Sequence, residues 1–233
     1  MAAARLQGKA VFLDRDGVIN RLVYRSETGS TELPASEAEF EILPKVAEAI
    51  RDLNQLGLKV IVVSNQPGVA KGVLSRRELR AMDDKFKAYL AVAEARIDAI
   101  YYCLHHPQGT VRSLRKRCSC RKPGIGLLRA AAKRFGLSVC NSYMVGDSVV
   151  DLAAGRRADC TTVFIGRWKC ELCQLKQNAC HPPDLVAKDL WSAVQIIKQD
   201  LSTARIGSVC QCKQSTARGR ERMTSRRPDG GAM

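Results

Sequence analysis

Short apolar runs recur along the chain, and longer segments with helically spaced apolar residues separate them. The runs are rich in β-branched residues and predict buried strands at residues 9–13, 58–63, 97–102, 142–145 and 161–165. The spaced segments predict helices over residues 44–56, 75–95 and 123–136, from about residue 148, and over residues 189–199. The first predicted helix has a start signal at Pro44 and a stop signal at Gly57. The second has a start signal in the capping-box pair Ser75 and Glu78.

Strands that alternate with helices predict an open α/β sheet that is mostly parallel, with right-handed crossovers. Composition favours the same fold, because hydrophobic residues make up 45% of the chain and aromatic residues only 5%. A core of Val, Ile, Leu and Ala suits a parallel sheet that is buried on both faces. The 233 residues suffice for one domain, which we place at 1–201. Residues 202–233 form a polar, basic and Gly-rich tail that we expect to be disordered.

Polar side chains stand at the carboxyl ends of three predicted strands. Asp14 and Asp16 follow the first strand, Ser64 follows the second, and Asp147 follows the fourth. Ligands of open α/β sheets bind outside this edge. The pattern therefore predicts that residues far apart in the sequence meet in one site.

The two carboxylates of Asp14-Arg15-Asp16-Gly17 have the chemistry that phosphoryl transfer needs. Asp14 could attack phosphorus and form an aspartyl-phosphate, while Asp16 could protonate the leaving oxygen and then activate water. Asp14 and Asp147 together offer oxygen ligands to Mg²⁺, which would neutralise charge between the carboxylates and the phosphate. A DxDG motif by itself is more often a turn or a calcium-type loop.

Two further groups could hold the transferring phosphoryl oxygens. Ser64, with nearby backbone amides, offers hydrogen-bond donors, and Lys122 offers a positive charge. Taken singly, Ser64-Asn65 is usually a helix cap and Lys122 a solvated surface charge. Their position at strand and helix ends, in the same order as the carboxylates, favours a single phosphate site.

In order along the chain, these motifs resemble those of the haloacid dehalogenase (HAD) superfamily phosphatases. The matching pieces lie within residues 9–166 and are Asp14-Arg15-Asp16-Gly17, Ser64-Asn65, Lys122, and Gly146-Asp147 with Asp151. The resemblance implies a Rossmann-like core, covalent catalysis through Asp14, and acid/base catalysis by Asp16. It also implies a Mg²⁺ ion on Asp14, Asp147 and the main-chain carbonyl of Asp16. We expect no large cap domain.

A Cys- and His-rich loop at residues 103–120 has the ligand spacing of a zinc site. Cys103, Cys118 and Cys120 supply thiols, and either His105 or His106 supplies an imidazole. Two close pairs separated by a loop are the usual arrangement of a closed tetrahedral Zn²⁺ site. The alternative is a loop in which these residues are unrelated. A structural zinc would order the loop and steady the basic residues that follow it.

The loop and its surroundings resemble the heptose bisphosphate phosphatases within the HAD superfamily. The resemblance rests on residues 8–20, 64–72, 103–107 and 118–123, and it favours His105 as the imidazole ligand. It implies hydrolysis of the 7-phosphate of D-glycero-D-manno-heptose 1,7-bisphosphate, with Asn65 and Arg121 contacting the substrate. Arginine is well shaped to grip a second phosphate.

Three positions depart from that family. Ser148 stands where the family often has a substrate-binding Lys, residues 21–24 match only loosely, and Ser64 replaces the usual Thr. One alternative is a histidinol-phosphate phosphatase, whose zinc loop is usually shorter. Another is a polynucleotide end phosphatase, because that group also has the HAD motifs and this chain is basic. A zinc-bearing binding module without catalysis is a fourth possibility, which the intact acidic residues argue against.

Charge and cysteine usage bear on partners and location. The net charge is +15, and residues 112–122 contain six Arg and Lys but no acid. With no apolar run of signal-peptide or membrane-span length, we expect a cytoplasmic monomer that acts on a small sugar phosphate rather than on nucleic acid. Reduced thiols favour metal binding, and a second zinc site is conceivable from a further cluster, Cys170, Cys173, Cys180 and His181.

Overall fold

The computed structural model describes residues 8–166 and 182–203, and its centre is a six-stranded sheet. Every pairing in this sheet is parallel, as predicted. The strands, in their spatial order, are β5 (Ala99–Cys103), β4 (Lys59–Asn65), β1 (Ala10–Leu13), β6 (Tyr143–Gly146), β7 (Thr161–Ile165) and β8 (Leu185–Ala187). The order reverses on the two sides of β1, which is the topological switch at which such sheets bind ligands.

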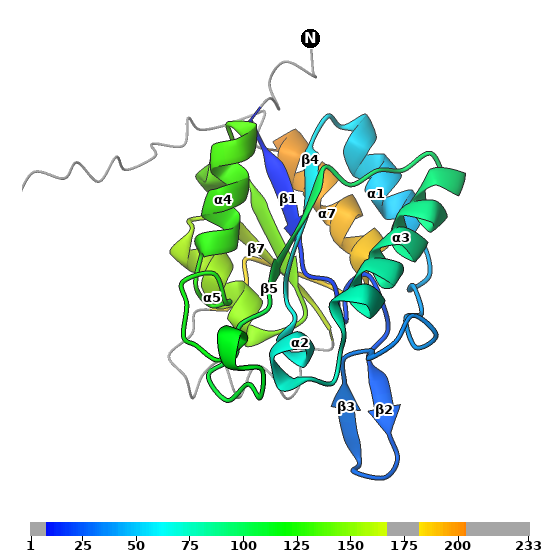
Figure 1. Ribbon diagram of the computed structural model, residues 1–233. Helices are drawn as coiled ribbons and strands as arrows, with labels where there is room; N and C mark the ends of the chain where they lie inside the picture. The colour runs from blue at the N-terminus through cyan, green and yellow to red at the C-terminus, as the bar shows by residue number, and fades with distance from the viewer. Residues whose placement is uncertain (1–7, 167–181, 204–233) are drawn as a thin grey trace, which may run out of the picture.

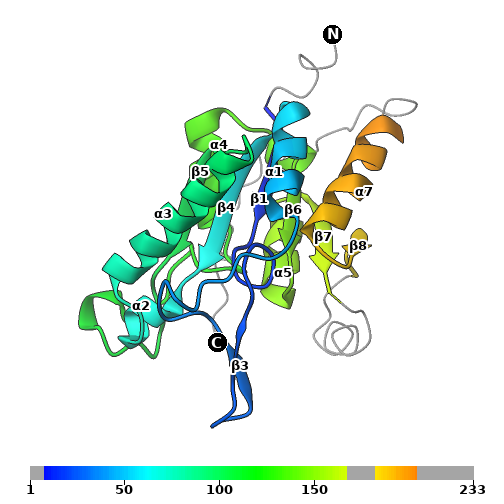
Figure 2. The same ribbon diagram turned by 90° about the vertical axis from the view of Figure 1, so that its right-hand side faces the viewer.

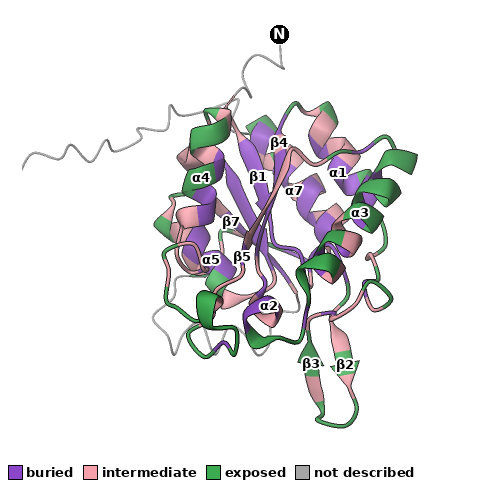
Figure 3. Cartoon of the chain, viewed as in Figure 1, coloured by how far each residue is buried: buried purple, intermediate pink, exposed green. Residues whose placement is uncertain are grey.

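Helices cover both faces of the sheet (Figures 1 and 2). One face carries α1 (Val46–Gln55), α3 (Arg76–Val92) and α7 (Leu190–Thr203), and the other carries α4 (Gly126–Phe135) and α5 (Val149–Arg157). Alternate residues of β1 serve the two layers, because Val11 and Leu13 pack with the first group and Phe12 packs with α4. Figure 3 shows β1 buried along its whole length.

Helix boundaries differ from the predicted ones at two prolines and at the last helix. α1 begins at Val46 and not at Pro44, because Lys45 has a left-handed backbone conformation with φ 62°. α4 begins at Gly126, three residues after Pro123. α7 continues to Thr203, so the helix includes two residues that we assigned to the tail. The rest of the tail lies outside the described residues.

Several short elements were not predicted. A hairpin of β2 (Val23–Arg25) and β3 (Ser30–Glu32) projects from the carboxyl edge of the sheet, and α2 (Pro67–Lys71) follows β4 directly. β8 pairs with the edge of β7. No separate cap domain is present in the described part of the chain, in agreement with expectation. Among the described helices, none has the length and apolarity that crossing a membrane requires.

Candidate active site

The carboxyl ends of β1 and β6 meet closely at one edge of the sheet. The backbone amide of Asp14 donates to the carbonyl of Val145 at 2.9 Å, which fixes the two strand ends together. Gly17 turns the chain with φ 83°, and a Cβ at this position would lie 1.9 Å from Oδ2 of Asp147. Only glycine lets the loop after β1 approach the aspartate after β6.

Three carboxylates gather around one buried lysine at this edge. Ligand oxygens of Asp14, Asp147 and Asp151 lie within 4.8 Å of one another. Nζ of Lys122 lies 2.8 Å from Oδ1 of Asp14 and 2.6 Å from Oδ1 of Asp151, and it donates to the carbonyl of Val63 at 2.8 Å. The lysine is 2% exposed, so it is not the solvated surface charge that an isolated Lys would suggest.

The crowding of acids raises their pKa values. Burial, followed by the charge of Asp151, raises the pKa of Asp14, although Lys122 opposes the shift. Burial and the charges of Asp14 and Asp151 raise the pKa of Asp147 to about 8. Burial works to lower the pKa of Lys122, but Asp14 and Asp151 outweigh it and raise that pKa above its ordinary value. One ammonium does not balance three closely spaced carboxylates, two of them buried, so the site is suited to a divalent cation.

Contacts distinguish the three carboxylates as possible metal ligands. Asp14 uses Oδ1 for Lys122 and for the backbone amide of Arg15, at 2.8 and 2.7 Å, so its Oδ2 is not engaged by these contacts. Asp151 is fully buried, with Oδ1 on Lys122 and Oδ2 on the backbone amide and hydroxyl of Ser148. Asp14 and Asp147 are therefore better disposed than Asp151 to hold Mg²⁺.

Asp151 has a structural and electrostatic role that we did not assign from sequence. It stands three residues after Ser148 in a capping box that opens α5, and a Cβ on Gly146 would lie 2.2 Å from its side chain. The spacing of Ser148 and Asp151 was the available signal. Its contact with Lys122 was not predictable, because it depends on how α5 packs on β6 and β7.

Asp16 belongs to a different set of contacts from Asp14. Its Oδ1 accepts from Arg15 and Asn20, and its Oδ2 accepts from Nε2 of Gln66 at 2.6 Å. The same Gln66 nitrogen donates to the hydroxyl oxygen of Ser64 at 3.1 Å. All five residues are buried. Arg15, Asn20 and Gln66 were not predicted to be functional residues.

The side chain of Asn65 holds Lys122 in place through two hydrogen bonds to the backbone of the lysine. Oδ1 of Asn65 accepts from the amide of Lys122 at 2.9 Å, and Nδ2 of Asn65 donates to the carbonyl of Lys122 at 3.1 Å. Arg121 is half-buried, and its guanidinium donates to the carbonyl of His105 at 3.4 Å. The predicted phosphate-binding residues thus lie together, with Arg121 against the Cys/His loop.

The loop after β5 brings together the four residues expected to bind zinc. The sulfur atoms of Cys103, Cys118 and Cys120 lie 3.2–3.5 Å apart, and Nδ1 of His105 lies 3.4 Å from Sγ of Cys120. Zn–S bonds of tetrahedral sites imply donor separations of about 3.8 Å, so a modest expansion admits the ion. His106 points elsewhere, because its Nδ1 accepts from the amide of Gln108.

The Cys/His loop is joined to β4 and α2. The amide of Gln66 donates to the carbonyl of Cys103 at 2.8 Å, and the amide of Val111 donates to the carbonyl of Ala70 at 2.9 Å. A Cβ on Gly124 would lie 2.3 Å from the carbonyl oxygen of Ser119, which shows how tightly the loop closes.

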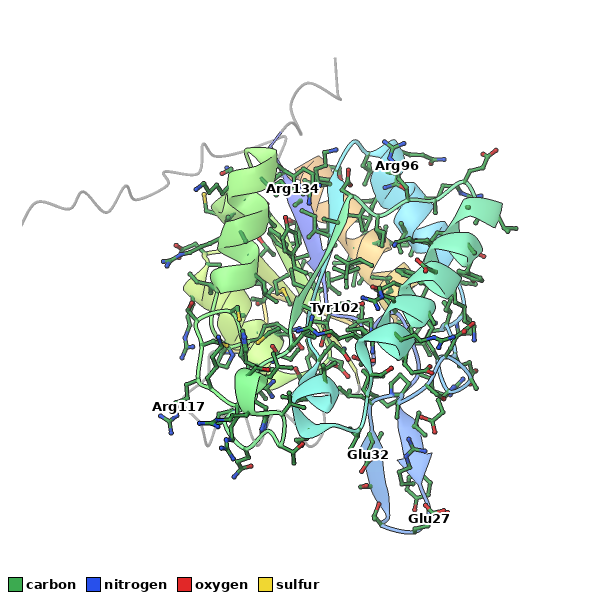
Figure 4. The ribbon with its side chains drawn as sticks, viewed as in Figure 1. Glu27, Glu32, Arg96, Tyr102, Arg117 and Arg134 are labelled. Atoms are coloured by element: carbon green, nitrogen blue, oxygen red, sulfur yellow. The ribbon has the colours of Figure 1, made fainter. Side chains whose placement is uncertain are left out.

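Basic side chains surround the outer part of this loop. Burial and then Lys116 and Arg76 lower the pKa of His105, and burial and then Arg121 and Lys71 lower that of His106. Arg117 extends from the same loop into solvent at the end of the molecule that carries the hairpin (Figure 4).

Two clefts open near the carboxyl edge of the sheet, and one of them reaches Asp147. A cavity of about 510 Å³ is bordered by Gly17, Arg21, Asp147 and Lys188, with apolar walls. A second cavity, of about 550 Å³, lies between the hairpin and α2 and reaches Gln66. Both clefts give access to the carboxyl edge of the sheet. The second Cys/His cluster, Cys170, Cys173, Cys180 and His181, lies outside the described residues.

The sheet, the paired aspartates and the buried lysine define the HAD class of phosphatases. The family model described as HAD-hydrolase-like matches residues 119–193. The D-glycero-β-D-manno-heptose-1,7-bisphosphate 7-phosphatase of Escherichia coli K12 is 34% identical over 196 residues, which cover 84% of this chain and 97% of that protein. The α-anomer 7-phosphatase of Photorhabdus laumondii is 34% identical over 157 residues, which cover 67% and 81%.

A solved structure agrees with these relatives. The D,D-heptose 1,7-bisphosphate phosphatase from B. bronchiseptica, complexed with magnesium and phosphate, superposes with a TM-score of 0.69. It is 31% identical, and the match covers 82% of this chain and 99% of that one. The chain therefore belongs to the HAD phosphatase family that contains the heptose bisphosphate 7-phosphatases.

Proposed function

We propose that this chain is a Mg²⁺-dependent phosphatase that removes the 7-phosphate of D-glycero-D-manno-heptose 1,7-bisphosphate. The observation that carries the chemistry is the ion pair of Lys122 with Asp14 beside Asp147, at the carboxyl edge of the sheet. Family membership and the activities named for the E. coli and P. laumondii relatives support the choice of substrate.

Phosphoryl transfer would begin at Asp14. A carboxylate oxygen of Asp14 forms a bond to phosphorus while the ester P–O bond breaks, and the leaving sugar oxygen takes a proton from Asp16. Asp16 then removes a proton from water, whose oxygen attacks the aspartyl-phosphate. Inorganic phosphate leaves and the carboxylate of Asp14 is restored.

Other groups would hold the phosphoryl oxygens and balance charge. Ser64 and Lys122 face the same edge and would bind the oxygens, with Asn65 keeping Lys122 in position. Mg²⁺ held by Asp14, Asp147 and the main-chain carbonyl of Asp16 would supply further charge neutralisation. Zn²⁺ held by Cys103, His105, Cys118 and Cys120 would be structural, because four protein ligands leave no open position.

Substrate choice is the first property to measure. Purified enzyme with Mg²⁺ is assayed for phosphate release from both anomers of the heptose bisphosphate, histidinol phosphate, other sugar phosphates and a 5′-phosphorylated oligonucleotide. We expect the highest kcat/KM for a heptose bisphosphate, with the anomer decided by the comparison. A clear preference for histidinol phosphate or the oligonucleotide would overturn the substrate and keep the HAD chemistry.

We also propose a cytoplasmic monomer with a small-molecule substrate and no nucleic-acid partner. Cys103, Cys118 and Cys120 form no disulfide in the described part of the chain, and a thiolate zinc site persists best where thiols stay reduced.

A further inference from the structure

Asp16 is held by four donors from three residues. Nε and Nη2 of Arg15 donate to its Oδ1 at 3.2 and 3.0 Å, and Nδ2 of Asn20 donates to the same oxygen at 3.0 Å. Nε2 of Gln66 donates to Oδ2 at 2.6 Å. Because both oxygens are engaged, the carboxylate has little freedom to rotate.

Arg15 is itself fixed by a buried aromatic environment. It is 2% exposed, and its guanidinium lies 5.4 Å from the ring centre of Phe40 and 5.6 Å from that of Tyr102. The hydroxyl of Tyr102 donates to Asp83 on α3, which holds the ring. Tyr102 is a partly buried residue of the edge strand β5 and lies on the side of that strand towards α3 (Figure 4). A buried cation between two rings keeps one orientation because few alternatives are open to it.

Gln66 connects Asp16 to the phosphate-binding end of β4. Its Nε2 is shared between Oδ2 of Asp16 and the hydroxyl of Ser64, at 2.6 and 3.1 Å. Its Oε1 accepts from Nη2 of Arg15 at 3.1 Å. This last bond sets the orientation of the amide, because a flipped amide would present Oε1 to the carboxylate of Asp16 and lose both donors.

We propose that Arg15 and Gln66 are positioning residues that aim the carboxylate of Asp16 at the leaving oxygen of a phosphate bound at Ser64. The inference rests on the proposed role of Asp16 as acid and base. Proton transfer needs the donor within hydrogen-bond reach of the leaving oxygen, and small displacements are costly. Neither Arg15 nor Gln66 has to touch the substrate for this effect.

Leaving-group dependence tests the proposal. A sugar alkoxide needs a proton to leave, whereas p-nitrophenolate leaves readily without one. For Gln66→Met and Arg15→Lys, we expect the single-turnover rate of sugar release from a sugar phosphate to fall about 10- to 100-fold. With p-nitrophenyl phosphate, single-turnover release of p-nitrophenolate reports formation of the aspartyl-phosphate before Asp16 acts as base, and we expect its rate to change by less than about threefold. Asp16→Asn should show the same selectivity to a greater degree.

Tyr143→Phe is the matched control for loss of a buried polar contact. Its hydroxyl donates to Asp200, and Tyr143 is the first residue of β6, whereas the site is at the far end of that strand. We expect this variant to retain kcat on both substrates. Thermal unfolding and zinc content identify variants that are folded, and Gln66→Met alone decides the question if Arg15→Lys does not fold.

The outcomes distinguish the positioning role of Arg15 and Gln66 from the acid/base role of Asp16. Selective loss with sugar phosphates supports positioning by Arg15 and Gln66. Equal loss with both substrates, or no loss, overturns it while leaving the proposed phosphatase intact. If Asp16→Asn itself shows no selectivity, the acid/base role fails, and with it the positioning role.

Discussion

At the scale of single residues, position at a strand end was the informative signal. Asp14, Ser64 and Asp147 were predicted to meet because parallel strands share one carboxyl edge, and the structure brings them there. Arg15 and Gln66 were not predicted as functional. Their role depends on side-chain direction and on partners from other elements, which periodicity does not reveal.

Replacing Asp14 tests the covalent step. We expect Asp14→Asn to reduce phosphatase activity to below about one-thousandth, because the amide is not a nucleophile. The variant should stay folded, since Asn keeps the shape and relieves repulsion with Asp151. Phosphate release and thermal unfolding measure the two effects, and substantial remaining activity would refute the aspartyl-phosphate route.

The raised pKa of Asp147 predicts a link between pH and Mg²⁺ binding. Burial, with the charges of Asp14 and Asp151, raises this pKa to about 8. In metal-free protein, Asp147 therefore contributes to the stability of the fold, fully so at pH values below the pKa that it has in the unfolded chain. This stabilisation is lost as the pH rises towards 8. Mg²⁺ needs the ionised form, so its affinity should rise about tenfold from pH 6 to pH 7.

Thermal unfolding with and without Mg²⁺ at pH 6, 7 and 8 measures this linkage. We expect the increase in Tm on adding Mg²⁺ to grow with pH, and Asp147→Asn to remove both the increase and its pH dependence. An increase in Tm that is the same at all three pH values would contradict the assignment of Asp147 as a ligand.

At the scale of elements, the strands and helices of the core were predictable and the additions at the rim were not. Runs of apolar residues identified all the strands except β8 and those of the hairpin. The hairpin is polar and largely exposed, and it is held by the ion pair of Arg25 with Glu39 at 2.6 Å and not by a hydrophobic face. β8 has only three residues and lies at an edge. The sequence patterns of the hairpin and of β8 therefore do not differ from the pattern of an ordinary loop.

The Cys/His loop at 103–120 should depend on its metal for order. We expect Cys118→Ser to lower zinc content below one equivalent per chain and to lower Tm, because the loop has few buried apolar contacts of its own. Activity should fall as well, because Lys122 lies two residues after the zinc ligand Cys120 and a less ordered loop would hold it less firmly. Metal analysis and unfolding measure these effects.

Cys140→Ser is the control, because Cys140 lies outside the cluster. It should keep both zinc and activity. A Cys118→Ser protein that binds a full equivalent of zinc and unfolds at the wild-type temperature would show that the ligands are misassigned.

At the scale of the whole molecule, charge is unevenly distributed around the site. The chain carries 38 Lys and Arg against 23 acids, and residues 112–122 lack acids altogether. In the described part of the chain, Arg112, Arg115, Lys116 and Arg117 make no ion pair. These cations create a positive field on one side of the carboxyl edge.

This field should speed the capture of highly charged substrates. We expect kcat/KM to fall with ionic strength, and to fall more steeply for a sugar bisphosphate than for a monophosphate. A combined Arg112→Gln, Arg115→Gln and Lys116→Gln variant should lose most of the difference between the two substrates while keeping kcat. Salt dependences that match for both substrates in the wild-type enzyme would show that the basic loop does not attract substrate.

The close approach of Gly17 to Asp147 and of Gly146 to Asp151 has a consequence for how such an enzyme diversifies. A Cβ at either glycine would strike a carboxylate, at 1.9 and 2.2 Å, so the floor of the site has no freedom to vary. New substrate preferences therefore have to arise at the rim, in the hairpin and in the loop at 103–120. Directed evolution towards another phosphate ester would be most productive there, with the floor left untouched.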